Sequence, residues 1–371
     1  MRMEITRPTV LEVDLNNFEH NVKQIQNYVG NNVKLMPVIK AAGYGTYINK
    51  CLEIINKFDI VAVAVVDEAV ELRNLGYEKE IFLLNQAYKD EIEKIARYDI
   101  TIGISSLGFL EELGKYEKNI NVHIEIGTGM GRTGINPARV EEYINEVKKY
   151  PNVKIEGMYT HLSSADIDFE YTEKQLNSFA RAVEAAKNIL GELKYIHCSA
   201  SNGILNFPNS YYNLVRPGII LYGYDSCDGA CQKLDLKPVC KLKSKITFLK
   251  EVGENISIGY SRSFITNRKT KVATVPIGYA DGMKRIFSNK AEVLVRGKRV
   301  PIIGSVCMDS FMIDVTDLDD AQVGDEVFIW DNENITVEEL AKMADTINYE
   351  IISCISNRVP RVFILRGESI E

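Results

Sequence analysis

The sequence has no long hydrophobic run, and its longest one, residues 60–66, is far too short to cross a bilayer. The first residues have no apolar core of the kind that a secretion signal needs. Positive charge is not in excess, since 44 Lys and Arg face 51 Asp and Glu, a formal net charge of −7. With no basic tract or aromatic stacking motif, this balance argues against nucleic-acid binding and against membrane contact by the chain itself. We expect a cytoplasmic enzyme.

Cysteine and histidine are also sparse. The seven cysteines are odd in number and scattered, which is typical of reduced thiols and excludes a disulfide framework. Only Cys227 and Cys231 are close, without a second pair or a nearby histidine, so we expect no metal site. Of the four histidines, His161 is the candidate for chemistry, whereas His197 is expected to be a core residue.

Short runs rich in Val and Ile alternate with amphipathic segments over the first part of the chain. The runs are residues 33–39, 60–66, 81–84, 100–104, 122–126, 155–159, 196–198 and 214–222. The amphipathic segments, residues 18–29, 66–75, 107–116, 140–150 and 171–190, have apolar residues at helical spacing. Eight alternations predict a (β/α)8 TIM-like barrel, with a doubly wound open sheet as the alternative.

The pattern changes after about residue 225, where helical segments nearly vanish. Short strands separated by turns are predicted at residues 239–252, 271–276, 291–295, 298–303, 311–315 and 326–329. One helix, residues 336–343, opens on a capping box made by Thr336 and Glu339. A C-terminal, mainly β domain therefore follows the barrel.

Lys40 leaves an apolar strand directly into a glycine-broken turn that contains Tyr44. Burial at the end of a strand disfavours the ammonium form and lowers the pKa of the amine. Such an amine can form a Schiff base with an aldehyde, although a strand that ends on a solvated lysine is the plainer interpretation of the motif alone. In a barrel, chemistry gathers at the carboxyl ends of the strands. Polar residues stand there at Lys40, Asn85, Arg132, His161, Ser201 and Arg216.

Several motifs together carry a resemblance to a known family. They are Lys-Ala-x-x-Tyr-Gly from Lys40, Gly-x-Gly-Arg ending at Arg132, and Val-Arg-Pro-Gly-x-x-Leu-Tyr-Gly from Val215. With further segments in the same order, the chain resembles the alanine racemase family of pyridoxal-phosphate enzymes. The resemblance implies a cofactor-binding barrel over residues 12–235. It also implies a β-rich domain of residues 1–11 and 236–371, joined by a first strand near residues 9–13.

The resemblance also implies which residues bind pyridoxal 5'-phosphate. They are Lys40, Tyr44, Leu84, His161, Ser201, Arg216, Gly218, Ile219 and Asn357. Glycine-rich turns near the last barrel strands suit a phosphate, held here by Ser201, Tyr44 and the backbone of Gly218 and Ile219. Arg216 would face the pyridine nitrogen and, because arginine keeps its protons, would leave the ring a weaker electron sink, as suits a racemase.

Racemisation needs a base on each face of the α-carbon. By the resemblance, Lys40 serves one face, and Tyr260, entering from the other subunit of a homodimer, serves the second. His161 would connect Tyr260 to Arg216. The residues implied for binding the amino-acid substrate are Arg132, Met308, Asn357, the entrance tyrosine Tyr279, and Asp309.

Three positions depart from the family pattern. Glu125 stands where many members have a carbamylated lysine, and we expect it to pair with Arg132; Gly127 stands where the family has aspartate. Asn357 replaces a tyrosine, which opens space and offers an amide to a serine hydroxyl. This pattern resembles the serine/alanine racemase domains of membrane-bound vancomycin-resistance proteins, and would make Met1 the start of an excised cytoplasmic domain.

The expected function is pyridoxal-phosphate-dependent racemisation of serine and alanine, supplying D-amino acid for peptidoglycan precursors. A strict alanine racemase is the first alternative. A barrel-type amino-acid decarboxylase is the second, which would have an acidic residue in place of Arg216. A non-catalytic pyridoxal-phosphate-binding protein is the third, and the β domain with Tyr260 and Met308 argues against it.

Overall fold

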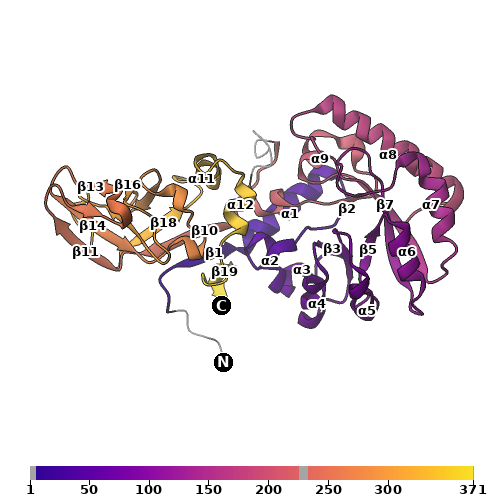
Figure 1. The fold of residues 1–371 in the computed structure, drawn as a ribbon, viewed down its shortest axis with the longest axis horizontal. Coiled ribbons are helices and arrows are strands. Elements are labelled where there is room, and N and C mark those ends of the chain that lie inside the picture. Colours follow the sequence, from indigo (N-terminus) through magenta and orange to yellow (C-terminus); the bar gives the residue numbers. More distant parts are fainter. Residues whose placement is uncertain (1–5, 225–232, 371) are drawn as a thin grey trace. The chain divides into compact units, whose positions relative to one another are not determined.

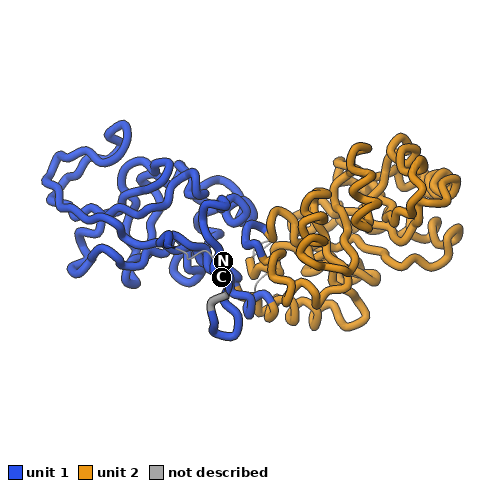
Figure 2. The backbone as a smooth tube through the Cα atoms, turned by 90° about the horizontal axis from the view of Figure 1, so that it is seen from below, with its two compact units in different colours: residues 1–18, 44–47, 238–371 blue, residues 19–43, 48–237 orange. Residues whose placement is uncertain are grey.

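The computed structural model describes residues 6–224 and 233–370. Two compact units make up the chain, and Figure 2 shows them in different colours. Unit 1 contains residues 1–18, 44–47 and 238–371, and unit 2 contains residues 19–43 and 48–237. Cys227 and Cys231 lie outside the described residues.

Among its described residues, unit 2 has eight strands, and each pairs in parallel with its neighbours. Figure 1 labels β2, β3, β5 and β7 among them. Six of the eight form one sheet in chain order: β3 (Ile60–Val63), β4 (Glu80–Leu83), β5 (Thr101–Ile104), β6 (Ile120–Glu125), β7 (Val153–Tyr159) and β8 (Tyr195–His197). The other two, β2 (Lys34–Leu35) and β9 (Leu214–Val215), pair with each other. Single bridges between Val38 and Ala62 and between Ala200 and Arg216 join this pair to β3 and β8. The strands therefore close into the predicted barrel.

Helices alternate with these strands. They are α1 (Leu15–Val29), α2 (Lys40–Tyr44), α3 (Leu52–Ile55), α4 (Val66–Leu75), α5 (Ile92–Arg97), α6 (Leu107–Gly114), α7 (Val140–Val147), α8 (Phe169–Leu190) and α9 (Ser201–Asn206). In α8 the Asp168 side chain caps the first turn by accepting from Tyr171 N, and Gly191 with φ 76° ends the helix. Apart from the adjacent pair Ala182 and Val183, its buried residues recur three or four apart, so one stripe of the helix faces the core.

Two expected barrel strands are shorter than predicted, and proline is the reason in both. Residues 33–39 pair regularly only at β2, because Pro37 has no N–H to donate to a ladder. Residues 214–222 are extended only at β9. After Pro217 and Gly218 the chain turns into a 3-10 helix, η5 (Ile219–Tyr222). This turn places the Arg216 side chain at the end of β9.

Unit 1 is a ten-stranded sheet in the order β11-β14-β17-β16-β15-β18-β10-β1-β19-β20. Its strands are β1 (Val10–Asp14), β10 (Cys240–Lys245), β11 (Phe248–Val252), β14 (Thr270–Val275), β15 (Glu292–Val295), β16 (Lys298–Ile303), β17 (Phe311–Asp314), β18 (Glu326–Trp330), β19 (Arg361–Leu365) and β20 (Glu368–Ile370). As expected, the first strand of the chain joins this β domain, where β1 runs antiparallel to β10 and parallel to β19.

The single strand predicted over residues 239–252 is in fact two, because the chain changes partners at its middle. β10 pairs with β18, whereas β11 pairs with β14. A short hairpin of β12 (Ser257–Ile258) and β13 (Phe264–Ile265) follows.

The helical part of unit 1 is α11 (Val337–Met343) and α12 (Asn348–Ser353). Thr336 caps α11 by accepting from Glu339 N at 3.1 Å. A capping box would also need the Glu339 carboxylate to accept from Thr336 N. This part of the prediction is wrong, because the Glu339 carboxylate binds Arg299 instead.

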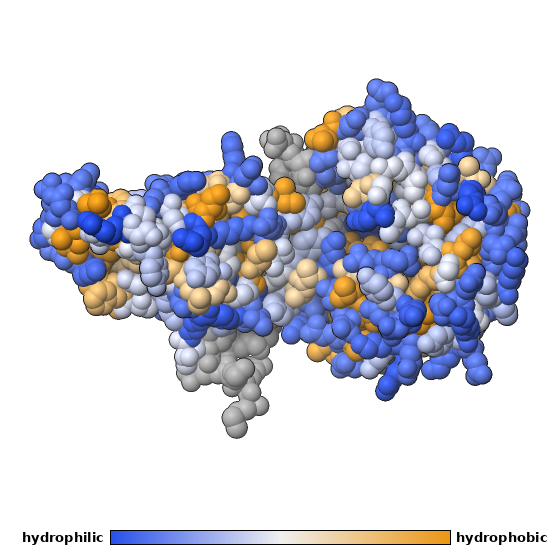
Figure 3. All heavy atoms as spheres, in the orientation of Figure 1, coloured by the Kyte–Doolittle hydropathy of each residue, from blue (hydrophilic) through white to orange (hydrophobic). Residues whose placement is uncertain are grey.

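The hydropathy of the surface and of the helices agrees with the composition of the chain. Figure 3 shows hydrophilic residues over most of the visible face of each unit, with apolar side chains in small groups between them. Within the described ranges, no helix combines the length and the hydropathy needed to span a bilayer.

Candidate active site

In unit 2, the sequence-predicted site residues follow the carboxyl ends of the barrel strands, where barrel enzymes place their chemistry. Lys40 comes just after Val38, which bridges to β3. Leu84 follows β4, and its N–H donates to Val63 O at 2.9 Å. Arg132 lies in the loop after β6, His161 follows β7, Ser201 opens α9 after β8, and Arg216 follows β9.

Lys40 is half-buried and opens a turn of unusual backbone geometry. Ala41, Ala42, Gly43 and Tyr44 all have positive φ, at 52°, 52°, 62° and 54°. A left-handed conformation costs roughly 1–2 kcal/mol for each residue that has a Cβ atom, so tertiary contacts must hold this turn. Burial, and then the positive charges of Arg132 and Arg216, lower the pKa of Lys40 below its usual value. The direction agrees with what we expected from its place in the sequence.

Arg216 is almost fully buried and has no carboxylate partner among the described residues. Its Nη1 donates to His197 Nδ1 at 2.7 Å. Its Nη2 donates to Thr160 O at 2.9 Å and Cys198 O at 3.0 Å, and lies 3.2 Å from His161 Nδ1. Neutral acceptors from several strand ends therefore fix the guanidinium.

The contact with His197 determines the tautomers of two buried histidines. A guanidinium only donates, so His197 Nδ1 must accept, and the ring proton is on Nε2. That Nε2 then donates to His123 Nδ1 at 2.9 Å, which leaves the His123 proton on an Nε2 with no partner in the described structure. Burial, with a smaller effect of nearby positive charge, lowers the pKa of His123 to about 3, and burial and Arg216 lower that of His197 strongly. Both rings are neutral near pH 7.

His197 is thus more than the core residue that we expected, because it orients Arg216. The sequence offered one clue, its position within the predicted strand of residues 196–198, four residues before Ser201. His161 is also neutral, since burial and then the charges of Arg216, Arg132 and Lys40 lower its pKa to about 3. With Nδ1 facing Arg216, His161 Nε2 carries the ring proton.

Ser201, Gly218 and Ile219 form a turn that is rich in donors. Gly218 N donates to Ser201 Oγ at 3.1 Å. Ile219 is fully buried, and its N–H has no acceptor among the residues that the structure describes. An unpaired buried N–H is costly, so this turn is suited to an anionic group.

The expected ion pair between Glu125 and Arg132 is wrong. Glu125 is buried and accepts from Thr133 Oγ1 at 2.7 Å, whereas Arg132 is exposed and has no ion pair in the described part of the chain. The loop geometry explains the difference, because a Cβ atom on Gly134 would lie 2.4 Å from Gly127 N. Thr133, which directly precedes Gly134, is the residue whose hydroxyl reaches Glu125.

In unit 1, Tyr260 projects from the tip of the β12–β13 hairpin and is 70% exposed. Gly259, with φ 75° and ψ −176°, precedes it. A Cβ atom there would lie 2.9 Å from Ser305 N, so this position requires glycine. Ser305 Oγ in turn donates to Tyr260 O at 3.3 Å. The expected contact of the Tyr260 phenol with His161 stays a prediction.

Tyr279 and Met308 lie on two segments of unit 1 that interlock through backbone hydrogen bonds. Tyr279 N donates to Cys307 O and Ala280 N to Met308 O, each at 3.0 Å. Gly278 permits this approach, since a Cβ atom on it would lie 2.3 Å from Met308 O. The N–H of Met308 has no acceptor among the described residues, and its role in binding a carboxylate stays a prediction.

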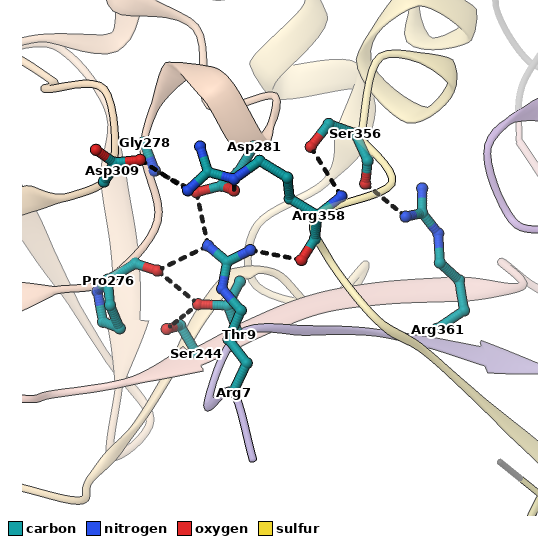
Figure 4. A network of polar contacts seen from close by, with 10 residues as sticks. All are labelled: Arg7, Thr9, Ser244, Pro276, Gly278, Asp281, Asp309, Ser356, Arg358 and Arg361. Atoms are coloured by element: carbon teal, nitrogen blue, oxygen red, sulfur yellow. Dashed lines mark hydrogen bonds and ion pairs between the residues drawn. The ribbon is translucent and has the colours of Figure 1, made fainter. Parts of the chain in front are cut away.

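Asp309 belongs to an ion-pair network around a fully buried carboxylate, Asp281 (Figure 4). Arg7 Nη2 lies 2.7 Å from Asp281 Oδ2, and Arg358 joins Asp281 at 3.6 Å to Asp309 at 2.7 Å. Gly278 N donates to Asp281 at 3.0 Å. The network therefore joins the segments that carry Tyr279, Met308 and Asn357, and Asp309 is already engaged by an arginine.

Asn357 and Tyr44, both in unit 1, differ in their surroundings. Asn357 is exposed, and its amide has no partner among the described residues. Tyr44 is buried, with its ring centroid 6.0 Å from that of Tyr349, and burial raises its pKa. Its segment is tied to the same loop as Asn357, because Arg361 donates to Gly45 O and to Ser356 O.

The donors of unit 2 fit a planar, anionic cofactor. Arg216 Nε is left without an acceptor among the described residues, although the side chain is 2% exposed. The buried Ile219 N–H is also free, and the Lys40 amine has no ion pair there. A ring nitrogen, a phosphate and an aldehyde would satisfy these three groups in turn.

Comparison with known proteins agrees with this chemistry. Residues 13–226 match the family described as alanine racemase, N-terminal domain, and residues 239–363 match alanine racemase, C-terminal domain. The alanine racemase of Halothermothrix orenii is 40% identical over 98% of both chains.

Solved structures also match this chain over nearly its whole length. The alanine racemase of Clostridium difficile 630 superposes with a TM-score of 0.94 at 36% identity, over 99% of this chain and 98% of that one. A Bartonella henselae alanine racemase with covalently bound pyridoxal phosphate matches with a TM-score of 0.87 at 29% identity, over 96% and 99%. These relatives are named alanine racemases, so the narrower resemblance to vancomycin-resistance proteins stays a prediction. The chain belongs to the alanine racemase family of pyridoxal-phosphate isomerases.

Proposed function

We propose that this protein interconverts L- and D-alanine, with Lys40 and Tyr260 as the two bases. The observation that carries the proposal is the buried, carboxylate-free Arg216, whose Nε–H is available to a ring nitrogen. A decarboxylase of the same architecture would need an acidic residue there. We place the reaction in the cytoplasm, as charge and cysteine pattern favour. Its expected use, supply of D-amino acid for peptidoglycan precursors, remains a prediction.

The cofactor supplies an aldehyde that captures the amino acid and a ring that withdraws electrons from its α-carbon. Lys40 would hold the cofactor, and its lowered pKa favours the neutral amine that can take a proton from one face. Ser201, Gly218 and Ile219, with Tyr44, would hold the phosphate. Arg216 stays protonated and limits electron withdrawal, so proton return is favoured over other outcomes.

For the substrate carboxylate, Arg132 of unit 2 has no ion pair and the Met308 N–H of unit 1 has no acceptor among the described residues, so each is a candidate donor. Binding of the carboxylate would orient the α-hydrogen toward a base. His161 is neutral near pH 7 and adds no positive charge of its own. In the proposed arrangement it would link the Tyr260 phenol to Arg216, and Arg216 would supply the positive charge that stabilises the deprotonated phenol.

Lys40→Ala tests the cofactor assignment. The purified variant, freed of added cofactor, should lose the absorption band near the visible edge and racemise alanine at a negligible rate, because no amine remains to hold the aldehyde. Lys50→Ala removes an exposed lysine that pairs with Glu71 and should keep both properties. Survival of the band and of racemisation in Lys40→Ala would refute the assignment.

A second measurement distinguishes racemisation from decarboxylation. In the unmodified protein, solvent deuterium should enter the α-position of alanine without release of carbon dioxide.

Serine is a second candidate substrate, on the strength of Asn357. Its exposed amide can both donate to and accept from a hydroxyl. An unpaired hydroxyl in a tight site costs about 1–3 kcal/mol, so the amide could raise serine turnover relative to alanine by roughly tenfold. Asn357→Tyr should therefore lower the ratio of serine to alanine racemisation. An unchanged ratio would leave strict alanine racemisation as the function.

A further inference from the structure

The carboxylate of Glu68 joins two segments of unit 2 at the carboxyl end of the barrel. Glu68 lies in the first turn of α4 and is half-buried. Its Oε2 accepts from Ala64 N at 2.8 Å and Val65 N at 3.3 Å, which caps the helix after β3. Its Oε1 accepts from Ala41 N at 2.6 Å. The residue directly after Lys40 is therefore held by a charged hydrogen bond from another element.

The turn that Glu68 contacts needs such support. Four consecutive residues from Ala41 to Tyr44 have positive φ, and three of them have a Cβ atom. Left-handed residues of this kind persist only where the surroundings hold them. Gly43 N donates to Ile39 O at 3.0 Å within the turn itself. The contact of Ala41 N with Glu68 is the support that reaches the turn from α4.

Glu68 also balances the charges that face Lys40. Arg132, from the loop after β6, and Arg216, from the end of β9, both lower the pKa of the Lys40 amine, as does its burial. Glu68, from α4, acts in the opposite direction and raises it. Removal of the Glu68 charge would leave only groups that disfavour the ammonium form.

We infer that Glu68 is the positioning residue of Lys40, holding the left-handed turn through Ala41 N–H and placing a negative charge beside the amine. The inference rests on the proposed function for the role of Lys40. Glu68 is not a catalytic residue in this view, because it acts through the backbone and the electrostatic field around the lysine.

The backbone part of the inference is tested by amide hydrogen exchange in the full chain. Glu68→Ala should accelerate exchange at Ala41 by about tenfold or more, since a hydrogen bond to a charged acceptor is lost. Glu68→Gln keeps one acceptor oxygen and should give a smaller acceleration. Asp67→Asn is the matched control, because Asp67 is the neighbouring carboxylate in α4 and pairs with Lys94 at 2.8 Å. It should leave Ala41 exchange unchanged.

The electrostatic part is tested by the rate at which cofactor-free protein captures added pyridoxal phosphate, followed by absorbance across a pH series. Capture needs the neutral amine, so the midpoint of the profile reports the pKa of Lys40. Loss of the Glu68 charge should move the midpoint of Glu68→Gln to lower pH, while Asp67→Asn should keep the wild-type midpoint. A Glu68→Gln profile and Ala41 exchange rate equal to those of Asp67→Asn would overturn the inference.

These readouts separate the inference from the proposed function. Ala41 exchange does not depend on any reaction, so an unchanged rate in both Glu68 variants would refute the positioning role even in an active racemase. Conversely, a wild-type protein that captures cofactor but does not racemise alanine would refute the proposed function and leave the exchange result standing.

Discussion

Buried charge at Arg216 is stabilised by neutral acceptors, and this arrangement explains why the two buried histidines are needed. A carboxylate partner would offset the positive charge of the guanidinium. With neutral acceptors only, that charge acts undiminished on a group bound at Nε. His197 Nδ1 accepts from Arg216 Nη1, and His197 Nε2 donates a hydrogen bond to His123 Nδ1. Because both rings have strongly lowered pKa values, they add no charge of their own near pH 7.

Tyr260→Phe should lower racemisation by roughly two to four orders of magnitude, the range for a positioned general base. The phenol is 70% exposed in unit 1, so its removal leaves no cavity and should not change the free energy of unfolding measurably. Steady-state rates in both directions, with isotope exchange from each enantiomer, are the measurement. Tyr279→Phe is the matched control and should retain most activity. If Tyr279→Phe loses activity and Tyr260→Phe does not, the two tyrosines exchange roles.

At the scale of elements, the β12–β13 hairpin positions the Tyr260 side chain at its tip. Its two strands have only two residues each, and Gly259, Ser261 and Arg262 all have positive φ at the tip. Ser305 Oγ donates to Tyr260 O and accepts from Ser263 Oγ, and these two hydrogen bonds tie the tip to the segment before Cys307. The hairpin is therefore placed by contacts within unit 1 rather than by its own ladder.

Gly259→Ala should disturb this tip. The residue has φ 75° and ψ −176°, a conformation that only glycine adopts readily, so alanine costs about 1–3 kcal/mol. Its Cβ would also lie 2.9 Å from Ser305 N. We expect racemisation to fall while cofactor absorbance is retained, measured on the same sample. Gly253→Ala, where a Cβ meets nothing within 4 Å, should behave like wild type. A fully active Gly259→Ala protein would show that the tip geometry is not needed.

At the scale of the whole molecule, we propose a homodimer whose active sites are shared, since Tyr260 is expected to act in the partner subunit. Lys40→Ala and Tyr260→Phe should each be inactive alone. When the two are mixed and allowed to exchange subunits, hybrid dimers contain one site with both bases. An equal mixture should then recover about a quarter of wild-type activity.

The size of the assembly should be measured on the same mixture by light scattering. Recovery of activity together with a dimeric mass would support the shared site. A mixture that stays inactive after verified subunit exchange would place both bases in one chain.

Much of the architecture can be predicted from the sequence, because the bounds of helices and strands depend on residues that are close together in the chain. The helix predicted over residues 66–75 begins and ends at those residues, since its apolar spacing and its C-terminal glycine are local signals. Lys40, Arg132, His161, Ser201 and Arg216 stand at strand ends because polar residues interrupt apolar runs there. The family that these motifs resemble is also the one whose domains match residues 13–226 and 239–363.

Other features required the tertiary structure, because their causes lie far away in the chain. The break between β10 and β11 reflects a change of partner strand, from β18 to β14. Residues 44–47 belong to unit 1 because Arg361, more than three hundred positions later, donates to Gly45 O. The tautomer of His197 depends on Arg216, and the turn after Lys40 depends on Glu68. Sequence periodicity reports which side of an element is buried, whereas the partner of a buried polar group is chosen by the closed fold.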